Sequence, residues 1–181
     1  MYCAVWGRKQ AMNHMTKSTE NSVELTLEPN ELARLNKTLE HAREAFDSKN
    51  LRFTDLREQV FTEIASTRGS IGAYDILERL AQKGTRLAPI SVYRSIDALM
   101  DAGVIHRLES KNAYFACRRH EHGGKGRPIF LACENCGTVT EVSAQPIFDA
   151  IKELAETAGF EPKVKFVEVS GLCSECKSNK G

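Results

Sequence analysis

Four of the six cysteines form two Cys-x-x-Cys pairs, and these pairs constrain the fold more than any other feature of the sequence. The pairs are Cys133 with Cys136 and Cys173 with Cys176. The opening residues lack the hydrophobic stretch of a secretory signal, and in a chain without that signal the spacing favours metal over disulfides. Four thiolates suit the tetrahedral preference of Zn²⁺ and leave no open position, so we expect a structural zinc. Two local disulfides and a redox-active dithiol are the alternatives.

The segment between the two pairs is too long for a simple zinc ribbon, and its pattern predicts strands around a helix. The expected strands are 129–133, 138–142 and 164–169. The expected helix runs from Pro146 to about Ala158 and ends at Gly159. Its inward-facing residues would be Ile147, Ile151, Leu154 and Ala158. We therefore expect the cysteine pairs to join the two ends of a small α/β unit.

The first half of the chain contains four helical patterns, in which apolar residues recur at spacings of three and four. These patterns run from Pro29 to about Phe46, from Thr54 as N-cap to before Gly69, from Ala73 to Gly84, and from Pro89 to Gly103. Two strand-like runs, 104–108 and 113–117, follow on either side of a polar turn. This order is typical of a winged helix-turn-helix with one extra helix in front, in which the fourth helix would read DNA. The expected fold class is α+β, a winged-helix DNA-binding domain followed by a small α/β domain.

Composition sets limits on partners and on location. Basic and acidic side chains are balanced, 25 against 24, so a DNA partner has to be argued from local features. The longest apolar runs are only a few residues, which predicts no membrane span, and the lack of a secretory signal makes the cytoplasm the expected location. The expected divisions are a disordered extension (1–28), the winged-helix domain (29–117), a glycine-rich hinge (118–127) and the zinc-binding domain (128–181).

A second set of potential metal ligands surrounds Cys117. Three of the five histidines lie near it in the sequence: His106, His120 and His122. If the hairpin turns through two residues at 110–111, strand pairing puts His106 and Cys117 on the same face. Glu141 could add an oxygen from the second domain, and a shell of nitrogen, sulfur and oxygen favours zinc over iron or manganese. The alternative is a small buried cysteine beside solvated histidines.

Several motifs taken together are specific to one family. They are Arg52-Phe53-Thr54, Ala73-Tyr74-Asp75-Ile76-Leu77, Ser91-Val92-Tyr93-Arg94, Cys133-Glu-Asn-Cys136-Gly137 and Gly171-Leu172-Cys173-Ser-Glu-Cys176. From roughly Leu51 to Cys176 the chain resembles the ferric uptake regulator superfamily, and specifically its zinc uptake regulator branch. The resemblance implies that the second domain forms a homodimer. It also implies that the zinc-loaded dimer binds a palindromic operator and represses zinc uptake genes, without catalytic activity.

The resemblance also assigns the metal ligands. It makes the four paired cysteines the structural zinc site, and it makes His106, Cys117 and Glu141 ligands of a sensing zinc. The family places a further histidine between Cys117 and the first pair, for which we prefer His122 and keep His120 as the alternative. Two zinc ions per chain are therefore expected. The histidine-rich cluster that iron-sensing members carry ahead of their first cysteine pair is missing here.

The same resemblance points to DNA contacts by Tyr74, Tyr93 and Arg94. For Arg94 the helical pattern agrees, because the apolar residues of its helix turn inward and leave a guanidinium that can bind guanine O6 and N7. We expect Ser91, Arg52 and Arg57 to meet phosphates at most. The tyrosines could instead pack against the protein.

Three other functions compete with a zinc-responsive repressor. A family regulator could sense iron, manganese or peroxide, although Cys117 as a ligand argues against this. A zinc hydrolase could use His120 and His122 around Glu121, but the spacing lacks the helical pattern of zinc peptidases. A winged-helix protein with structural zinc only would bind DNA regardless of added zinc.

Overall fold

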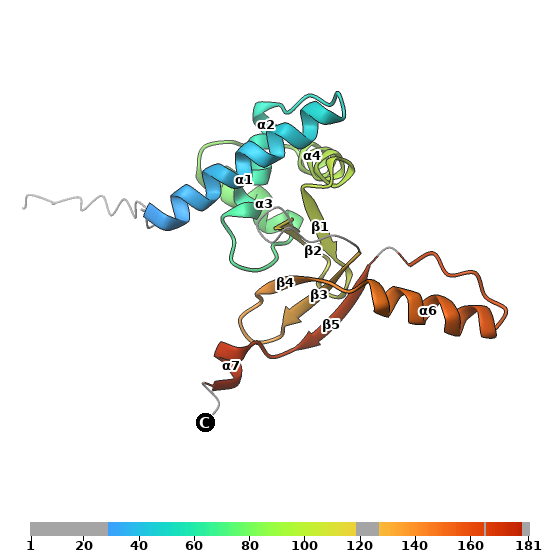
Figure 1. Cartoon of the computed structure of the whole chain (residues 1–181). Helices are drawn as coiled ribbons and strands as arrows, with labels where there is room; N and C mark the ends of the chain where they lie inside the picture. The colour runs from blue at the N-terminus through green and yellow to red at the C-terminus, as the bar shows by residue number, and fades with distance from the viewer. Residues whose placement is uncertain (1–28, 119–126, 165, 179–181) are drawn as a thin grey trace, which may run out of the picture.

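The structure, a computed structural model, describes residues 29–118, 127–164 and 166–178. Four helices and a two-stranded wing form the first part of this region, and a three-stranded sheet with two helices forms the second (Figure 1). The expected combination of a winged helix with a small α/β unit is therefore confirmed. Among the described residues no helix has both the length and the apolar character needed to cross a membrane.

The four N-terminal helices are α1 (Pro29–Ser48), α2 (Asp55–Ala65), α3 (Ala73–Gln82) and α4 (Pro89–Ala102). The predicted N-cap of α2 is present, because the Thr54 hydroxyl accepts a hydrogen bond from the backbone N–H of Arg57. At the end of α4, Gly103 takes up the left-handed conformation with φ of 79° that a side chain would strain.

The apolar faces of these helices meet in one core. Its fully buried members include Phe46, Phe61, Ile64, Ile76, Ile96 and Leu99. Burying a side chain of this size stabilises a fold by about 1.5–3 kcal/mol, so this core fixes how α4 is presented to solvent. Leu32 continues the apolar spacing of the first helical pattern but is exposed, because the first turn of α1 extends past the rest of the domain (Figure 1).

The wing consists of β1 (Ile105–Leu108) and β2 (Ala113–Ala116), paired antiparallel with His106 opposite Phe115. The turn between them is longer than the two residues expected. A 3₁₀ turn, η1 (Glu109–Lys111), is followed by Asn112 with φ of 47°. Asparagine tolerates this left-handed conformation, so the longer turn closes the hairpin in the register that the two-residue turn would give.

The second part is built on a sheet in the order β4-β3-β5. Its strands are β3 (Pro128–Cys133), β4 (Val139–Ser143) and β5 (Val167–Gly171). β3 pairs antiparallel with β4 and parallel with β5, and α6 (Gln145–Thr157) lies in the crossover between β4 and β5. The strand expected at 164–169 begins at Val167 instead, because Val164 packs beside Phe148 before the sheet starts. A short helix, α7 (Ser174–Ser178), ends the described chain.

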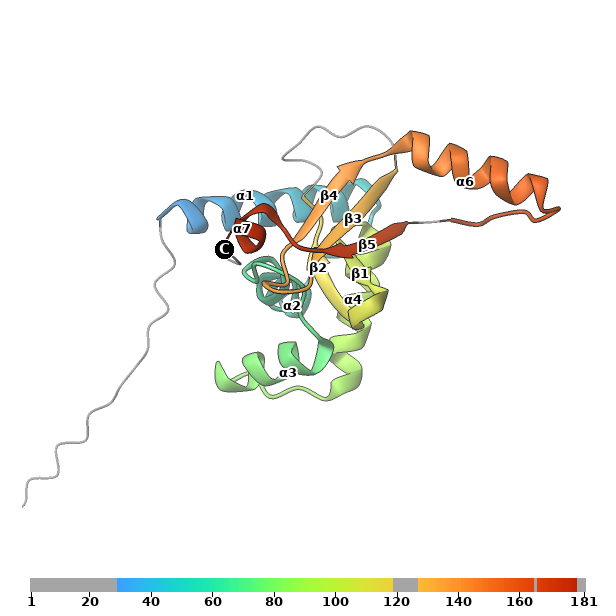
Figure 2. The ribbon, with the colours of Figure 1, turned by 90° about the horizontal axis from the view of Figure 1, so that it is seen from below.

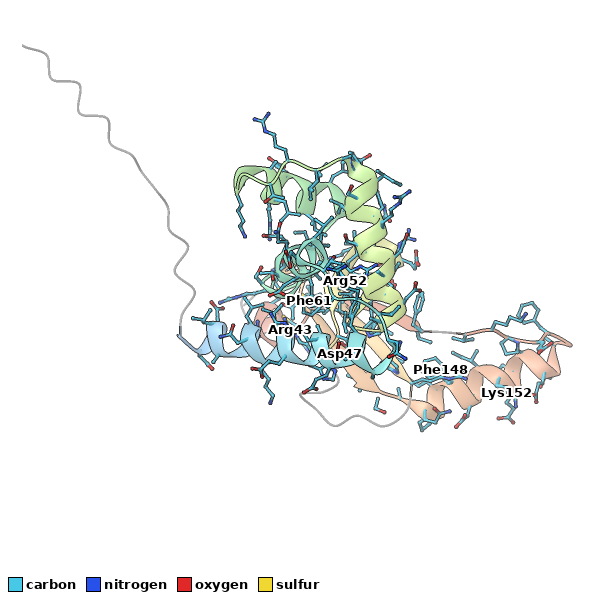
Figure 3. All side chains as sticks on the ribbon, turned by 90° about the horizontal axis from the view of Figure 1, so that it is seen from above. Arg43, Asp47, Arg52, Phe61, Phe148 and Lys152 are labelled. Atoms are coloured by element: carbon cyan, nitrogen blue, oxygen red, sulfur yellow. The ribbon has the colours of Figure 1, made fainter. Side chains whose placement is uncertain are left out.

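Helix α6 differs from the sequence-based prediction in what it buries. Of the residues expected to face inward, Leu154 is 72% exposed and Ile147 is 41% exposed, while the buried residue is Phe148. The reason is that α6 projects away from the rest of the chain in both ribbon views (Figures 1 and 2). Figure 3 shows Phe148 and Lys152 on this helix, apart from Arg52 and Phe61 in the helical domain.

The wing packs on the second sheet and forms a shared core with it. Leu108 and Phe115 of the wing are buried together with Phe130, Ala132 and Val139 of the sheet. The rings of Phe115 and Phe130 meet edge to face, with centroids 5.0 Å apart. The wing therefore packs against both the helical part and the second sheet. The boundary expected at 118–127 stays a prediction, because residues 119–126 lie outside the described chain.

Candidate metal centres

The two cysteine pairs come together at one end of the second sheet. Cys133 ends β3, and Cys173 and Cys176 lie just before and within α7. The four sulfur atoms all lie within 4.8 Å of one another, and those of Cys136 and Cys173 are 3.7 Å apart. Because β3 and β5 run parallel, their C-terminal ends lie side by side and bring the two pairs together.

Hydrogen bonds act differently on the individual thiols of this cluster. The pKa of Cys133 is lowered to about 6, because the backbone N–H groups of Cys136 and then Cys173 donate to its sulfur. The pKa of Cys136 is lowered by its hydrogen bond with the Thr138 hydroxyl. The pKa of Cys176 is raised to about 12, since donation from the Asn135 side chain is outweighed by the neighbouring thiols and by burial.

This cluster fits a zinc ion. Four sulfur atoms this close together repel one another when ionised, and a divalent cation removes that repulsion. The donor set and its tetrahedral number match structural zinc. Gly137 follows the first pair and has a φ of 74°, a left-handed conformation that favours glycine.

The cysteine cluster also contacts the winged helix, which the sequence does not reveal. Gly69, in the loop between α2 and α3, forms an isolated β-bridge with Thr138. A Cβ atom on Gly69 would collide with the backbone carbonyl of Gly137. Only glycine allows the loop to come this close to the cysteine turn.

A second cluster joins the wing to the sheet. His106 of β1, Cys117 just after β2 and Glu141 of β4 each offer a ligand atom, and these atoms lie within 4.8 Å of one another. The Glu141 Oε2 atom is 3.7 Å from the Cys117 sulfur and 3.9 Å from His106 Nε2. His106 pairs with Phe115, two residues before Cys117, so the predicted shared face of the hairpin is confirmed.

The surroundings of this cluster suit a cation. The Glu141 side chain is only 4% exposed, and its Oε1 atom accepts a hydrogen bond of 2.8 Å from the backbone N–H of Arg118. The rings of Phe115 and Phe130 lie 5.6 and 5.1 Å from the His106 ring, between centroids. A buried carboxylate is costly without a compensating charge, which a metal ion supplies. His122, expected as the fourth ligand, and its alternative His120 lie outside the described residues.

The residues expected to meet DNA lie on or near α3 and α4. Helix α4 turns Val92, Ile96 and Leu99 into the core, which leaves Arg94 and Tyr93 exposed. Within the described chain the Arg94 guanidinium makes no hydrogen bond or ion pair. Tyr74, at the start of α3, is 72% exposed.

The expected phosphate contacts are less uniform. Arg52 is exposed, while Ser91 is half-buried at the start of α4. The guanidinium of Arg57 donates to the Arg52 carbonyl and lies 5.7 Å from the centre of the Phe46 ring. Arg57 therefore has a structural role in holding α2 against α1, whatever else it binds.

The shared core of wing and sheet is the main functional feature that the sequence analysis misses. The signal for it is the unbroken apolar run of β2, in which all four residues are buried. A wing exposed on one face would alternate apolar and polar side chains. The run from Ala113 to Ala116 instead indicates that the hairpin is covered on both faces.

The fold and the two clusters define a winged-helix protein with a second, α/β domain. One set of metal ligands lies in the second domain, and the other lies between that domain and the wing. Residues 48–170 match the model of the ferric uptake regulator family. The chain belongs to this family, in its zinc uptake regulator branch, as its motifs predict.

Several relatives support this assignment. The chain is 32% identical to the zinc uptake regulation protein of Escherichia coli (strain K12) over 138 residues, which cover 76% of this chain and 80% of that protein. The protein of that name from Mycobacterium tuberculosis is 24% identical, with 71% and 96% covered. A solved zinc uptake regulator complexed with zinc and DNA superposes with a TM-score of 0.72 at 29% identity, covering 81% and 97%. The crystal structure of holo XcZur superposes with a TM-score of 0.68 at 31% identity, covering 79% of this chain and 99% of that one.

Proposed function

We propose that this protein is a zinc-responsive transcriptional repressor, whose zinc-loaded homodimer binds palindromic operator DNA and represses zinc uptake genes. The observation that carries the proposal is the His106–Cys117–Glu141 cluster, because it links the DNA-binding wing to the second sheet. A metal bound there holds the two domains in one relative orientation. It binds DNA and regulates transcription, and it has no catalytic residue. It acts in the cytoplasm.

We assign two zinc ions to each chain. Cys133, Cys136, Cys173 and Cys176 hold a structural zinc, since a closed set of four thiolates leaves no position for exchange. His106, Cys117 and Glu141 hold the regulatory zinc, with His122 as the fourth ligand and His120 as the alternative. A thiolate is a soft ligand, and its presence favours zinc over manganese or ferrous iron. The zinc named in the solved relatives supports this choice.

The regulatory zinc works by shifting a population. Zinc that binds only when wing and sheet are correctly placed stabilises that arrangement by RT ln(1 + [Zn]/Kd), about 2.7 kcal/mol at one hundred times Kd. His106 and Cys117 come from the wing and Glu141 comes from β4. If the wing is displaced from the sheet, these ligand atoms no longer meet around one ion. Free zinc concentration is thereby converted into the fraction of protein that can bind DNA.

The exposed face of α4 is the DNA-reading surface in this proposal. Arg94 projects from it with no partner among the described residues, as a guanidinium that binds guanine in the major groove would. Tyr93 and Tyr74 add base or sugar contacts, and Ser91, Arg52 and Arg57 add phosphate contacts. The DNA-bound relative, which superposes over most of this chain, supports this arrangement.

The exposed apolar residues of the second domain support a homodimer. They are Leu131, Val142, Ile147, Leu154, Phe160, Val169 and Leu172. Monomeric proteins rarely expose so many large apolar side chains in one domain, and a second copy of the chain would cover them. A two-fold dimer presents two reading helices, which matches a palindromic operator with half-sites about one helical turn apart.

The decisive experiment is a zinc titration of the protein with fluorescently labelled palindromic operator DNA. The zinc that stays bound after desalting is counted first, and about one ion per chain is expected. Binding of a second ion should then switch on DNA binding, with iron and manganese failing at buffered physiological levels. DNA binding that does not depend on the second zinc would leave a constitutive DNA-binding protein and reject the proposal.

A further inference from the structure

A carboxylate of the second sheet holds the tip of the wing through atoms that belong to neither metal cluster. The Oε1 atom of Glu168, on β5, accepts a hydrogen bond of 2.6 Å from the backbone N–H of Glu109. Its Oε2 atom accepts one of 3.2 Å from the backbone N–H of Ser110. Both donors belong to η1, the turn of the wing, so one side chain binds two successive amides.

The position of Glu168 is fixed by its strand. It pairs with Phe130 of β3, and Phe130 in turn packs against Phe115 of the wing and against the His106 ring. Glu168 is half-buried, and a carboxylate that accepts from amides near apolar side chains makes stronger hydrogen bonds than one in water. Lys111 adds a contact, since its ammonium group donates to the Cys133 carbonyl at 3.4 Å.

We propose that Glu168 is a positioning residue for the regulatory zinc: it holds the wing on the sheet and so places His106 and Cys117 opposite Glu141. The inference rests on the proposed function. Glu168 has no atom in the ligand cluster. It fixes the turn of the hairpin, and the hairpin carries His106 on β1 and Cys117 just after β2. Its carboxylate offers both wing amides an acceptor that no neutral side chain of equal length provides.

The consequence is a specific division of effects. Without Glu168 the wing samples more orientations in the absence of zinc, so zinc has to order it and binds less tightly. Once zinc is bound, the ligands themselves hold the wing. A Glu168 variant should therefore need more zinc to bind DNA, yet reach nearly the same DNA affinity when zinc is saturating.

The test compares Glu168→Ala and Glu168→Gln with the natural chain in the zinc titration of operator DNA. We expect the alanine variant to raise the zinc concentration at half-maximal DNA binding roughly tenfold, the size expected for charge-assisted hydrogen bonds. Glutamine keeps one acceptor oxygen and should fall between the two. DNA affinity at saturating zinc should change by less than about twofold, which loss of fold would not allow. Glu40→Gln, which removes the same charge from an exposed position on α1, is the control.

Two outcomes would overturn the inference. If the natural chain responds to zinc and Glu168→Ala has the same zinc midpoint, Glu168 does not position the site and the proposed function stands. The positioning role is also rejected if both Glu168 variants lose DNA affinity equally at low and saturating zinc, because the residue then serves only folding. A natural chain that ignores added zinc would instead reject the proposed function together with this inference.

Discussion

Cys117 provides the sulfur of the His106–Cys117–Glu141 cluster. Replacing it tests zinc sensing without removing the structural zinc. We predict that Cys117→Ser abolishes zinc-dependent operator binding, because a hydroxyl is a poor ligand for zinc at neutral pH. The dimer should stay folded and keep about one zinc per chain. The measurements are fluorescence anisotropy with labelled operator and a zinc count after desalting. A Cys117→Ser protein that still requires zinc to bind DNA would show that the sensing site lies elsewhere.

Cys136 provides the matched comparison for Cys117. Structural zinc contributes folding free energy of about 10–16 kcal/mol in small zinc domains, which equals or exceeds the total stability of a typical domain. Cys136→Ser should therefore unfold the second domain, seen as lost near-ultraviolet circular dichroism and lost zinc. The two substitutions make the same chemical change, so their different results would separate the two roles of zinc.

Arg94 is the residue on which sequence specificity depends in the proposed complex. Arg94→Ala should weaken operator binding by about 1–3 kcal/mol and reduce discrimination against operators with a changed guanine. Arg34→Ala, an equal loss of charge at an exposed site on α1, should have little effect. Competition between natural and altered operators measures both variants. If Arg94→Ala weakened all DNA sequences equally, its contact would be to phosphate and not to a base.

At the residue scale the sequence predicts most of the candidate sites. Spacing alone pairs the four cysteines, and strand parity brings His106 and Cys117 to one face because the observed turn keeps the register of the two-residue turn assumed from the sequence. Glu168 could not be found in this way, because its partners are backbone amides almost 60 residues away, which leave no pattern in the sequence. The choice between His120 and His122 stays a prediction.

The contact between the loop after α2 and the cysteine turn is a property of two elements. Gly69→Ala should destabilise the protein by about 1–3 kcal/mol, because the new Cβ would push against the Gly137 carbonyl and force the loop away. Thermal unfolding with both zinc ions bound measures the loss. Gly171→Ala, whose added Cβ meets open space among the described residues, is the control. Equal melting temperatures for Gly69→Ala and the natural chain would mean that this contact adds no stability.

At the scale of elements, periodicity predicts where helices lie better than what covers them. The α6 pattern correctly predicts a helix within one or two residues, but its apolar stripe faces away from its own chain. The repeat of apolar residues is the same whether a helix packs on its own domain or on a second copy. The late start of β5 has a similar origin, because Val164 is apolar and packs, partly buried, against Phe148 without belonging to the sheet.

At the scale of the whole molecule, the exposed apolar stripe of α6 makes assembly testable. We predict that Leu154→Asp shifts the dimer to monomers, because the dimer would have to bury an unpaired carboxylate. Operator affinity should fall strongly, since a monomer reaches only one half-site. Sedimentation velocity measures the assembly, and Leu154→Met, which keeps an apolar side chain of similar volume, should remain dimeric. A Leu154→Asp protein that stays fully dimeric would exclude this face from the interface.

The overall architecture follows from the sequence because helices, turns and cysteine spacing each leave local patterns. The relation between the two domains does not, since it depends on which face of the wing meets which face of the sheet. Phe115 and Phe130 are both apolar strand residues, and nothing local indicates that they touch.

The core that wing and sheet share also limits how this protein can be taken apart. A fragment cut after the hairpin would leave Leu108 and Phe115 to water, and the remaining fragment would expose Phe130. The winged helix is thus not an interchangeable module that could be grafted onto another sensor by joining the chains after the hairpin. A chimaera would have to inherit β3 and its aromatic residue along with the wing, so reader and sensor in this chain can be exchanged only together.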